Sequence, residues 1–275
     1  MDLFSALVLG VVEGVTEFLP VSSTGHLTIA EKALGLPIDD EGITAFTAVI
    51  QIGAIAAVLV YFRSDLWRIS TAWLRGVVRP EHRGGFDHRF GWYVIAGSVP
   101  IVVVALLGQS LITGPLRSLW WVAGALVAWS AVMVVSERVA TQRRGERDVG
   151  LRDVLVIGLL QCAALIPGVS RSGATISAGL FLGLDRVTST RLSFFLSIPA
   201  LVGAGLYELP SALGGGIGWL PTAVATVVSF VVAYLSIAWL LKFVAGHSIA
   251  VFVWYRLALG AVLLALLGTG TISAT

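Results

Sequence analysis

The 275-residue sequence predicts an all-α integral membrane protein with six full transmembrane helices and two re-entrant helical hairpins in an inverted-topology repeat. Composition is the first reason. Hydrophobic residues make up 57% of the chain, charged residues only 12%, and the mean hydropathy is +0.91. So few charges cannot cover the surface of a soluble protein of this size. The other two reasons are six long apolar runs and a phrase that occurs twice.

The repeated phrase is GVVEGVTEFLPVSSTG at residues 10–25 and GLLQCAALIPGVSRSG at residues 158–173. An internal repeat of this kind constrains the architecture of the whole chain. At a constant offset of 148 residues the matching positions are Gly10/Gly158, Val21/Val169, Ser22/Ser170, Gly25/Gly173 and the related pair Glu13/Gln161.

The two copies lie in the segments 2–35 and 154–184, which are apolar but broken near the middle by Pro, Gly and Ser. Each half has about 15 residues, or roughly 22 Å as a helix, which is too short to cross the bilayer. Non-helical backbone at membrane depth is tolerated only inside protein or beside a water-filled cavity. We therefore expect two hairpins that enter the membrane and turn back.

The remaining apolar runs are each near the 20 residues that span about 30 Å of hydrocarbon. They are residues 43–62, 91–108, 119–136, 193–210, 221–243 and 249–268. The sequence thus predicts one membrane domain, residues 1–275. Its two halves, 1–136 and 154–268, are joined by the loop 137–153.

Arginine counting predicts the orientation. Of 18 Lys and Arg, six lie in 63–90 and five in 137–153, whereas 109–118 and 211–220 together contain only Arg117. The positive-inside rule places the two arginine-rich loops in the cytoplasm and the acidic run Asp39-Asp40-Glu41 outside. Three spans then separate the two hairpins. Because an odd number of spans reverses the direction in which the chain crosses the membrane, the second half has the opposite orientation to the first. Many transporters share this plan.

Glu13 and Glu17 lie four residues apart in the first hairpin, so both carboxylates share one helix face. On an insertion scale, an acidic residue at the centre of a membrane helix costs ~2.5–3.5 kcal/mol. The plain alternative is an interfacial helix whose glutamates reach water. A functional role is the default interpretation for acids at membrane depth.

The turn that follows brings hydroxyl groups to the start of the returning half-helix: Ser22, Ser23, Thr24, Gly25 and His26. A helix N-terminus offers free N–H groups to an anion, and glycine allows close approach. Helix capping alone explains one hydroxyl residue but not three beside a histidine.

The second hairpin carries Ser170, Arg171, Ser172, Gly173 and Thr175. The guanidinium of Arg171 stays charged and its planar set of donors suits phosphate. The alternative partner is Glu13 or Glu17, and both interpretations hold if substrate displaces the ion pair.

Together the hairpins favour phosphoryl transfer, with arginine and backbone amides holding phosphate and a serine or histidine attacking. Gln51, in an apolar span, is a supporting hydrogen-bond donor. The copies differ: Gln161 and Leu165 replace the glutamates, and Arg171 replaces Ser23. This asymmetry favours one composite site. The alternative is a lipid-phosphate flippase or secondary transporter. A scaffold would leave the buried charges unexplained. CxxC, HExxH and Walker motifs are absent from the sequence.

The stretches EGVTEFLPVSSTGH and PGVSRSGAT resemble the undecaprenyl pyrophosphate phosphatase (bacitracin-resistance) family of bacterial inner-membrane proteins, and the resemblance covers the whole chain. It implies hydrolysis of undecaprenyl diphosphate to undecaprenyl phosphate and inorganic phosphate. This reaction recycles the lipid carrier for peptidoglycan synthesis. The resemblance also implies a role in bacitracin resistance. The implied location is the bacterial plasma membrane, with the site open to the outer side.

The resemblance also implies residue roles. The catalytic set is Glu13, Glu17, Ser23, His26 and Arg171, and the phosphate-binding set is Ser22, Thr24, Gly25, Ser170, Arg171, Ser172 and Thr175. A divalent cation, Mg²⁺ or Ca²⁺, is implied, with Glu13 and Glu17 as ligands. We favour Ser23 as nucleophile with His26 as base, although histidine attack stays open.

One departure from many relatives is Thr47 after Phe46, where they carry an acid. Phosphatidic-acid-type phosphatases are disfavoured because their lysine–arginine and final histidine–aspartate motifs are absent from the sequence. The expected partners are a polyprenyl diphosphate lipid and the bilayer. No nucleic-acid partner is expected, and a homodimer stays open.

Overall fold

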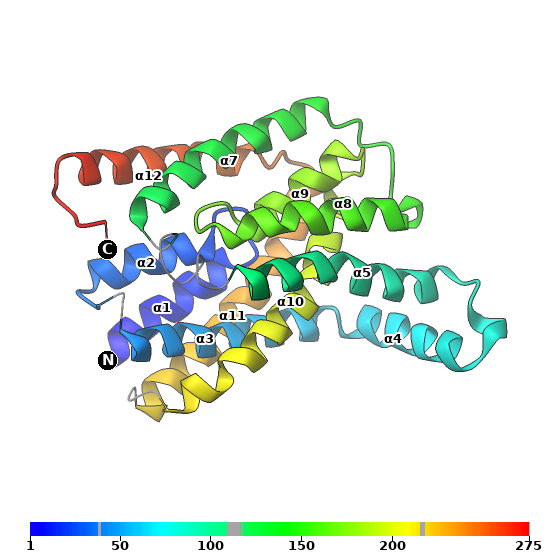
Figure 1. Cartoon of the computed structure of the whole chain (residues 1–275), viewed down its shortest axis with the longest axis horizontal. Helices are drawn as coiled ribbons and strands as arrows, with labels where there is room; N and C mark the ends of the chain where they lie inside the picture. Colours follow the sequence, from blue (N-terminus) through cyan, green and yellow to red (C-terminus); the bar gives the residue numbers. More distant parts are fainter. Residues whose placement is uncertain (38–39, 109–115, 117, 215–217, 275) are drawn as a thin grey trace.

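The computed structural model describes residues 1–37, 40–108, 116, 118–214 and 218–274, without the side chains of residues 41 and 207–214. Asp39 and Arg117, which entered the orientation argument, lie outside the described residues, as does the side chain of Glu41. Within these ranges there are eleven α-helices and no β-strand (Figure 1). The all-α prediction is confirmed.

Six helices are long and apolar enough to cross a membrane, and they coincide with the six predicted runs. They are α3 (Glu41–Tyr61), α5 (Phe86–Leu107), α7 (Leu119–Val139), α10 (Arg186–Gly214), α11 (Trp219–Val244) and α12 (Ala250–Gly268). Each is a long apolar stretch with a polar or irregular segment at its ends, as a spanning helix requires.

Two pairs of short helices occupy the broken segments. The first pair is α1 (Leu3–Thr16) and α2 (Ser23–Ala33), and the second is α8 (Leu151–Gln161) and α9 (Arg171–Phe181). The short 3₁₀ helix η4 (Cys162–Leu165) extends α8, and the members of each pair contact one another. In Figure 1, α1 and α2 lie toward the left of the molecule, and α8 and α9 toward the right.

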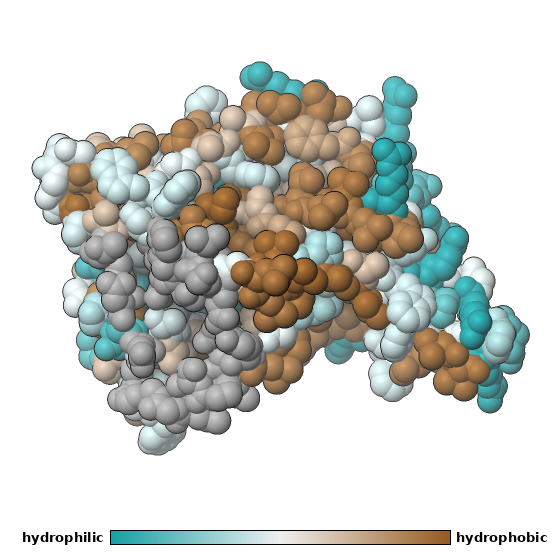
Figure 2. All heavy atoms as spheres, in the orientation of Figure 1, coloured by the Kyte–Doolittle hydropathy of each residue, from teal (hydrophilic) through white to brown (hydrophobic). Residues whose placement is uncertain are grey.

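Helix α11 is an example of a spanning helix with one face buried in the protein and another face exposed. Its buried positions recur at helical spacing: Ala225, Ser229, Ala233, Ile237, Leu240 and Val244. The exposed positions Val227, Val231 and Leu235 also recur every four residues and lie on another face. Similar apolar side chains cover the middle of the face shown in Figure 2, and hydrophilic ones gather at its right-hand end. This is the pattern of a protein whose perimeter faces lipid.

Close helix packing explains the first glycine of the repeated phrase. A Cβ atom on Gly10 would lie 2.6 Å from the backbone oxygen of Ala225 on α11. A Cβ atom on Gly158 would meet the backbone oxygen of Gly97 on α5 even more closely. Both short pairs therefore pack against a spanning helix through a glycine at the same position of the repeat.

The segment 63–90 was expected to be a loop, and this expectation was wrong for its first half. Residues Arg63–Val78 form helix α4, followed by the 3₁₀ helix η1 (Pro80–His82). Helix α4 is amphipathic and packs against α5, burying Ile69 and Gly76. The arginines of this segment indicated a charged loop, whereas the spacing of its apolar residues is that of an amphipathic helix.

Candidate active site

The two turns between the short helices both contain a serine in an unusual backbone conformation. Ser22, before α2, has φ 79°, and Ser170, before α9, has φ 76°. These are equivalent positions of the repeat. Residues other than glycine seldom adopt positive φ, and the strain costs of order 1–3 kcal/mol where it occurs. Such strain persists only where surrounding contacts hold it, and it clusters at functional sites.

The surrounding contacts join one turn to the other. The N–H of Gly168 donates to the Ser22 hydroxyl (3.1 Å), and the Ser172 hydroxyl donates to the carbonyl of Leu19 (2.8 Å). The Ser170 hydroxyl accepts from the N–H of Gly173 (3.2 Å) and caps α9. Residues about 150 positions apart in the chain thus form one unit, and a composite active site at this unit stays a prediction.

An ion pair lies at this junction. The Arg171 guanidinium donates to Glu17 Oε1 at 2.6 Å, and the Ser23 hydroxyl donates to Glu17 Oε2 at 2.6 Å. The Glu17 side chain is only 5% exposed and that of Arg171 14%. Removing two charges from water is costly, so a buried pair like this is weak evidence of a stabilising role. An anion that replaces Glu17 would find a charged donor already positioned.

Glu13 has a different environment from Glu17. Both of its carboxylate oxygens are buried and have no hydrogen-bond partner within the described part of the chain. It lies close enough to Glu17 and Arg171 to interact with both charges. Gln161, the equivalent residue of the repeat, is also fully buried with its amide atoms unpaired among the described residues. Unpaired buried polar atoms of this kind point to a bound water or ion.

This environment fits part of a cation site. The oxygens of Glu13 are suitable ligands for Mg²⁺ or Ca²⁺, whereas those of Glu17 already accept hydrogen bonds from Ser23 and Arg171. Among the described residues no three His, Cys, Asp or Glu side chains group together. A cation here would therefore need water and phosphate oxygens, which is the usual arrangement for Mg²⁺.

A cavity of about 480 Å³ opens beside the ion pair. Its polar lining residues are Glu17, Ser22, Ser23, Thr24, Gln51, Ser170 and Arg171. Its apolar walls come from α5, from α10 and from the segment that follows α8, through Ile101, Val102, Ala105, Leu106, Ala164, Leu165, Pro167, Ala200, Leu201, Gly203 and Ala204. Gln51 lines this cavity, and its role as a supporting hydrogen-bond donor stays a prediction. The apolar walls could not be predicted from the sequence, because residues facing a cavity and residues facing lipid are alike in composition.

His26 was expected to act as the base for Ser23, but the two side chains do not contact one another in the structure. Its Nδ1 is 2.7 Å from the carbonyl of Ser22, its Nε2 is 2.6 Å from the Tyr255 hydroxyl, and its ring stacks on that of Tyr255. Both ring nitrogens are therefore engaged away from Ser23. The physical reason is that Ser23 turns back toward Glu17 on α1, whereas His26 faces α12.

Three residues predicted to contact phosphate do not line the cavity: Gly25, Ser172 and Thr175. The Thr175 hydroxyl donates to the carbonyl of Arg171 (2.8 Å) and pairs with Ser193 (2.6 Å). A Cβ atom on Gly25 would lie 2.9 Å from the side chain of Val122 on α7. These residues support the turns, and their predicted contact with phosphate stays a prediction.

Arg256, on α12, is a site residue that the sequence interpretation missed. It is fully buried and donates to the carbonyls of Pro20 (3.2 Å) and Gly168 (2.9 Å), which are equivalent positions of the repeat. It also reaches Ser130 and the carbonyl of Leu126 on α7. The available signal was an arginine inside an apolar span, which is costly and marks a function by default.

These features define a class: a polytopic helical membrane protein with an arginine–glutamate–serine set beside a partly apolar cavity. The family model described as bacitracin resistance protein BacA matches residues 6–262. The chain is 59% identical over 278 residues to undecaprenyl-diphosphatase 3 of Frankia casuarinae, covering 100% of both chains. It is 58% identical over 269 residues to undecaprenyl-diphosphatase 1 of Streptomyces avermitilis, covering 98% of this chain and 97% of the relative. The chain belongs to the bacitracin resistance protein BacA family.

Proposed function

We propose that the protein is a membrane phosphatase that hydrolyses undecaprenyl diphosphate to undecaprenyl phosphate and inorganic phosphate. The names of its relatives, at 48–59% identity over nearly their whole length, support this reaction. The observation that carries the proposal is the pairing of Glu17 with both Arg171 and Ser23 beside a cavity with apolar walls. A charged donor suits the diphosphate, and the apolar walls suit the first isoprene units.

In the proposed mechanism Arg171 exchanges Glu17 for the terminal phosphate, two oxygens of which can accept parallel hydrogen bonds from the planar guanidinium. Glu17 then accepts the proton of Ser23, whose oxygen attacks the terminal phosphorus. The bond from that phosphorus to the bridging oxygen breaks, and the proton passes to the departing undecaprenyl phosphate. Water next attacks the phosphoserine, Glu17 takes a proton from it, and Ser23 regains that proton as inorganic phosphate leaves.

Glu13 is the proposed ligand of the divalent cation, since its buried oxygens have no other described partner. When bound, the cation would neutralise charge on the phosphate oxygens. The cavity-lining residues orient the lipid whether or not the cation is bound.

We propose that α1–α2 and α8–α9 are re-entrant hairpins of an inverted repeat. The equivalent conformations of Ser22 and Ser170 support this, and so does the equivalent packing of Gly10 and Gly158. The cavity is lined by the end of α5 that precedes residue 108, far from the arginine-rich end. With the arginines in the cytoplasm, the site faces the outer side of a bacterial plasma membrane. There the product would serve peptidoglycan synthesis, and bacitracin resistance would follow.

The test is phosphate release by purified protein from C55 and C15 diphosphates, with and without a chelator. We expect Glu17→Gln and Arg171→Ala to lower kcat/KM at least a hundredfold, and the chelator to abolish turnover reversibly. The matched controls are Glu81→Gln for Glu17→Gln and Arg138→Ala for Arg171→Ala. Each control removes a charge of the same sign as its test variant, but from an exposed position. Near wild-type turnover by Glu17→Gln and Arg171→Ala would refute the proposed site. Lipid movement across sealed vesicles without phosphate release would favour the flippase or transporter.

The serine and histidine alternatives are separated by a second comparison. Because Ser23 contacts Glu17 and His26 contacts Tyr255, Ser23→Ala should lower turnover by orders of magnitude and His26→Gln by about tenfold or less. Acid quenching during turnover of radiolabelled substrate should trap phosphate on serine. Phosphate trapped on histidine would reverse the assignment.

A further inference from the structure

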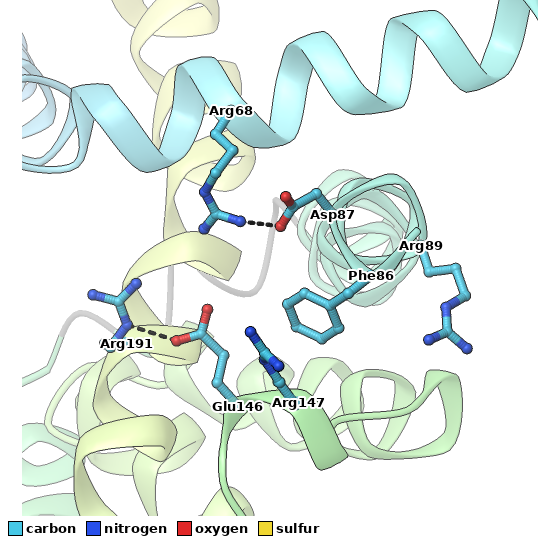
Figure 3. A pocket seen from close by; sticks show the side chains of 7 residues that line it. All are labelled: Arg68, Phe86, Asp87, Arg89, Glu146, Arg147 and Arg191. Carbon is cyan, nitrogen blue, oxygen red and sulfur yellow. Dashed lines mark hydrogen bonds and ion pairs between the residues drawn. The ribbon is translucent and has the colours of Figure 1, made fainter. Parts of the chain in front are cut away.

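A second cavity lies at the arginine-rich end of the molecule and has a volume of about 580 Å³ (Figure 3). It is enclosed by α4, α5, α10 and the 3₁₀ helix η3 (Glu146–Asp148). Its lining residues are Arg68, Phe86, Asp87, Arg89, Glu146, Arg147 and Arg191. The lining thus contains four guanidinium groups and two carboxylates.

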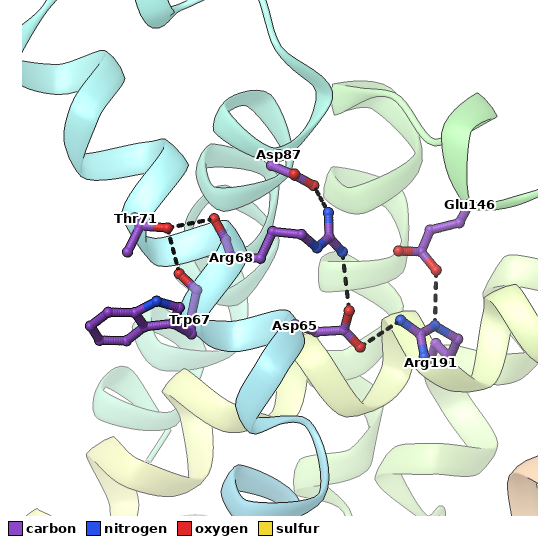
Figure 4. Close-up of polar contacts among 7 residues, drawn as sticks. All are labelled: Asp65, Trp67, Arg68, Thr71, Asp87, Glu146 and Arg191. Carbon is purple, nitrogen blue, oxygen red and sulfur yellow. Dashed lines mark hydrogen bonds and ion pairs between the residues drawn. The ribbon is translucent and has the colours of Figure 1, made fainter.

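Both carboxylates in this lining are already paired. Arg68 forms an ion pair with Asp87 and with Asp65 (3.1 Å). Arg191 pairs with Glu146 (2.8 Å) and with the other oxygen of Asp65 (3.0 Å), so Asp65 connects the two arginines (Figure 4). This network of three carboxylates and two guanidinium groups fixes one wall of the cavity and carries one negative charge in excess.

Arg191 is held by aromatic rings as well as by acids. Its guanidinium carbon lies 5.4 Å from the ring centre of Phe62 and 5.6 Å from that of Phe195, distances typical of cation–π contacts. A donor positioned in this way loses little conformational entropy when it binds a further group.

Arg89 and Arg147 outweigh that negative charge and make the cavity positive. Neither side chain makes a hydrogen bond or ion pair within the part of the chain that the structure describes, and no dashed line reaches either in Figure 3. The ring of Phe86 lies between them in that view. Two unpaired arginines in a preformed hollow with an aromatic wall are suited to an anion that carries apolar groups.

This cavity is separate from the proposed active site. Arg89 lies near the start of α5, whereas Val102 of the active-site cavity lies thirteen residues later on the same helix. At 1.5 Å per residue these positions are about 20 Å apart. Binding at one site therefore does not require contact with the ligand of the other.

We propose that the cavity between α4, α5, η3 and α10 binds a phosphate-bearing anion, with Arg89 and Arg147 as its principal ligands. The anion is the headgroup of an acidic membrane lipid or a free phosphate group. Basic pockets between membrane helices are well suited to acidic headgroups, because the bilayer presents the ligand at high local concentration.

The test is native mass spectrometry of the detergent-solubilised full chain, titrated with phosphatidylglycerol or with phosphatidylcholine. All proteins carry Arg171→Ala, so that the active-site cavity contributes little. We expect Arg89→Gln/Arg147→Gln to raise the Kd for phosphatidylglycerol at least tenfold. The matched control is Arg138→Gln/Arg143→Gln, which removes two exposed arginines outside the cavity, and its Kd should change less than twofold.

Equal changes in the two double variants, or no preference of the parent protein for phosphatidylglycerol, would overturn the proposal. Inorganic phosphate added to the titration distinguishes the two sources. Displacement of phosphatidylglycerol at millimolar phosphate assigns the cavity to the phosphate group alone, and retention assigns it to the lipid headgroup. With Arg171 intact, Arg89→Gln/Arg147→Gln should release phosphate from C55 diphosphate within twofold of wild type.

Discussion

At the residue scale, Arg256 shows how a charge inside the membrane is made tolerable. Its guanidinium finds acceptors on both turns and on α7, so the cost of burial is offset by hydrogen bonds, two of them to the turn carbonyls of Pro20 and Gly168. Pro20 and Gly168 come from opposite halves of the chain, which makes this side chain a brace between them.

We expect Arg256→Gln to disturb both stability and turnover. Each buried carbonyl left without a donor costs ~1–3 kcal/mol, so the melting temperature should fall by several degrees. Phosphate release should fall at least tenfold because Glu17 and Arg171 no longer meet correctly. Thermal unfolding in detergent and a phosphate-release assay measure the two effects, with Arg138→Gln as control. Unchanged values would mean that the turns do not depend on Arg256.

Asp65 allows a pH prediction at the same scale. Burial by itself raises the pKa of this carboxyl, but hydrogen bonds from Arg68 and Arg191 outweigh that effect and hold the pKa below its ordinary value of 3.8. A carboxyl of this kind contributes stability that is present above 3.8 and is lost as the pH falls through the folded-state pKa.

Asp65→Asn should therefore destabilise the protein at pH 7 by ~0.2–1 kcal/mol, since the pair is partly exposed. The difference in melting temperature from wild type should shrink as the pH is lowered below 3.8. Thermal unfolding between pH 3 and pH 7, with Glu81→Gln as control, is the measurement. A difference that stays constant with pH would contradict the ion-pair explanation.

At the element scale, the short helices depend on close contact with spanning helices. Gly10 brings α1 against α11, and Gly158 brings α8 against α5. The pairing is backbone to backbone, as membrane helices use small residues to approach closely. These contacts set the position of each turn along the spanning helix that it packs against.

Gly10→Ala and Gly158→Ala should each lower the melting temperature and the phosphate-release rate, because the added methyl group meets backbone that cannot rotate away. Gly124→Ala on α7 is the control, since a Cβ atom there would meet nothing within 4 Å. It should be neutral or stabilising by up to about 1 kcal/mol, given the better helix propensity of alanine. Equal effects at all three positions would contradict the packing explanation.

At the scale of the whole molecule, orientation is a prediction that labelling can test. We expect Asp40→Cys to react with an impermeant maleimide from outside intact cells, and Gly84→Cys and Gly145→Cys to react only after permeabilisation. The background is Cys162→Ser, which removes the single native cysteine. The reverse pattern would overturn the orientation and place the proposed active site on the cytoplasmic side.

The sequence by itself determined the class of the protein and its spans. Hydrophobic length and composition are local properties, and a membrane imposes them on every spanning helix, so the six runs could be predicted. The repeated phrase likewise indicated that the two broken segments belong together. Glu17, Ser23 and Arg171 were identified because charge and hydroxyl groups are conspicuous in apolar sequence.

Only the tertiary structure decided which of these groups meet. It paired Ser23 with Glu17 rather than His26, left Glu13 without a described partner and brought Arg256 to both turns. Such contacts depend on side-chain direction and on helices far apart in the chain. A residue-by-residue pattern does not contain them. The same holds for the arginine-lined cavity, whose members are scattered over more than a hundred residues and meet only because four elements pack at one end.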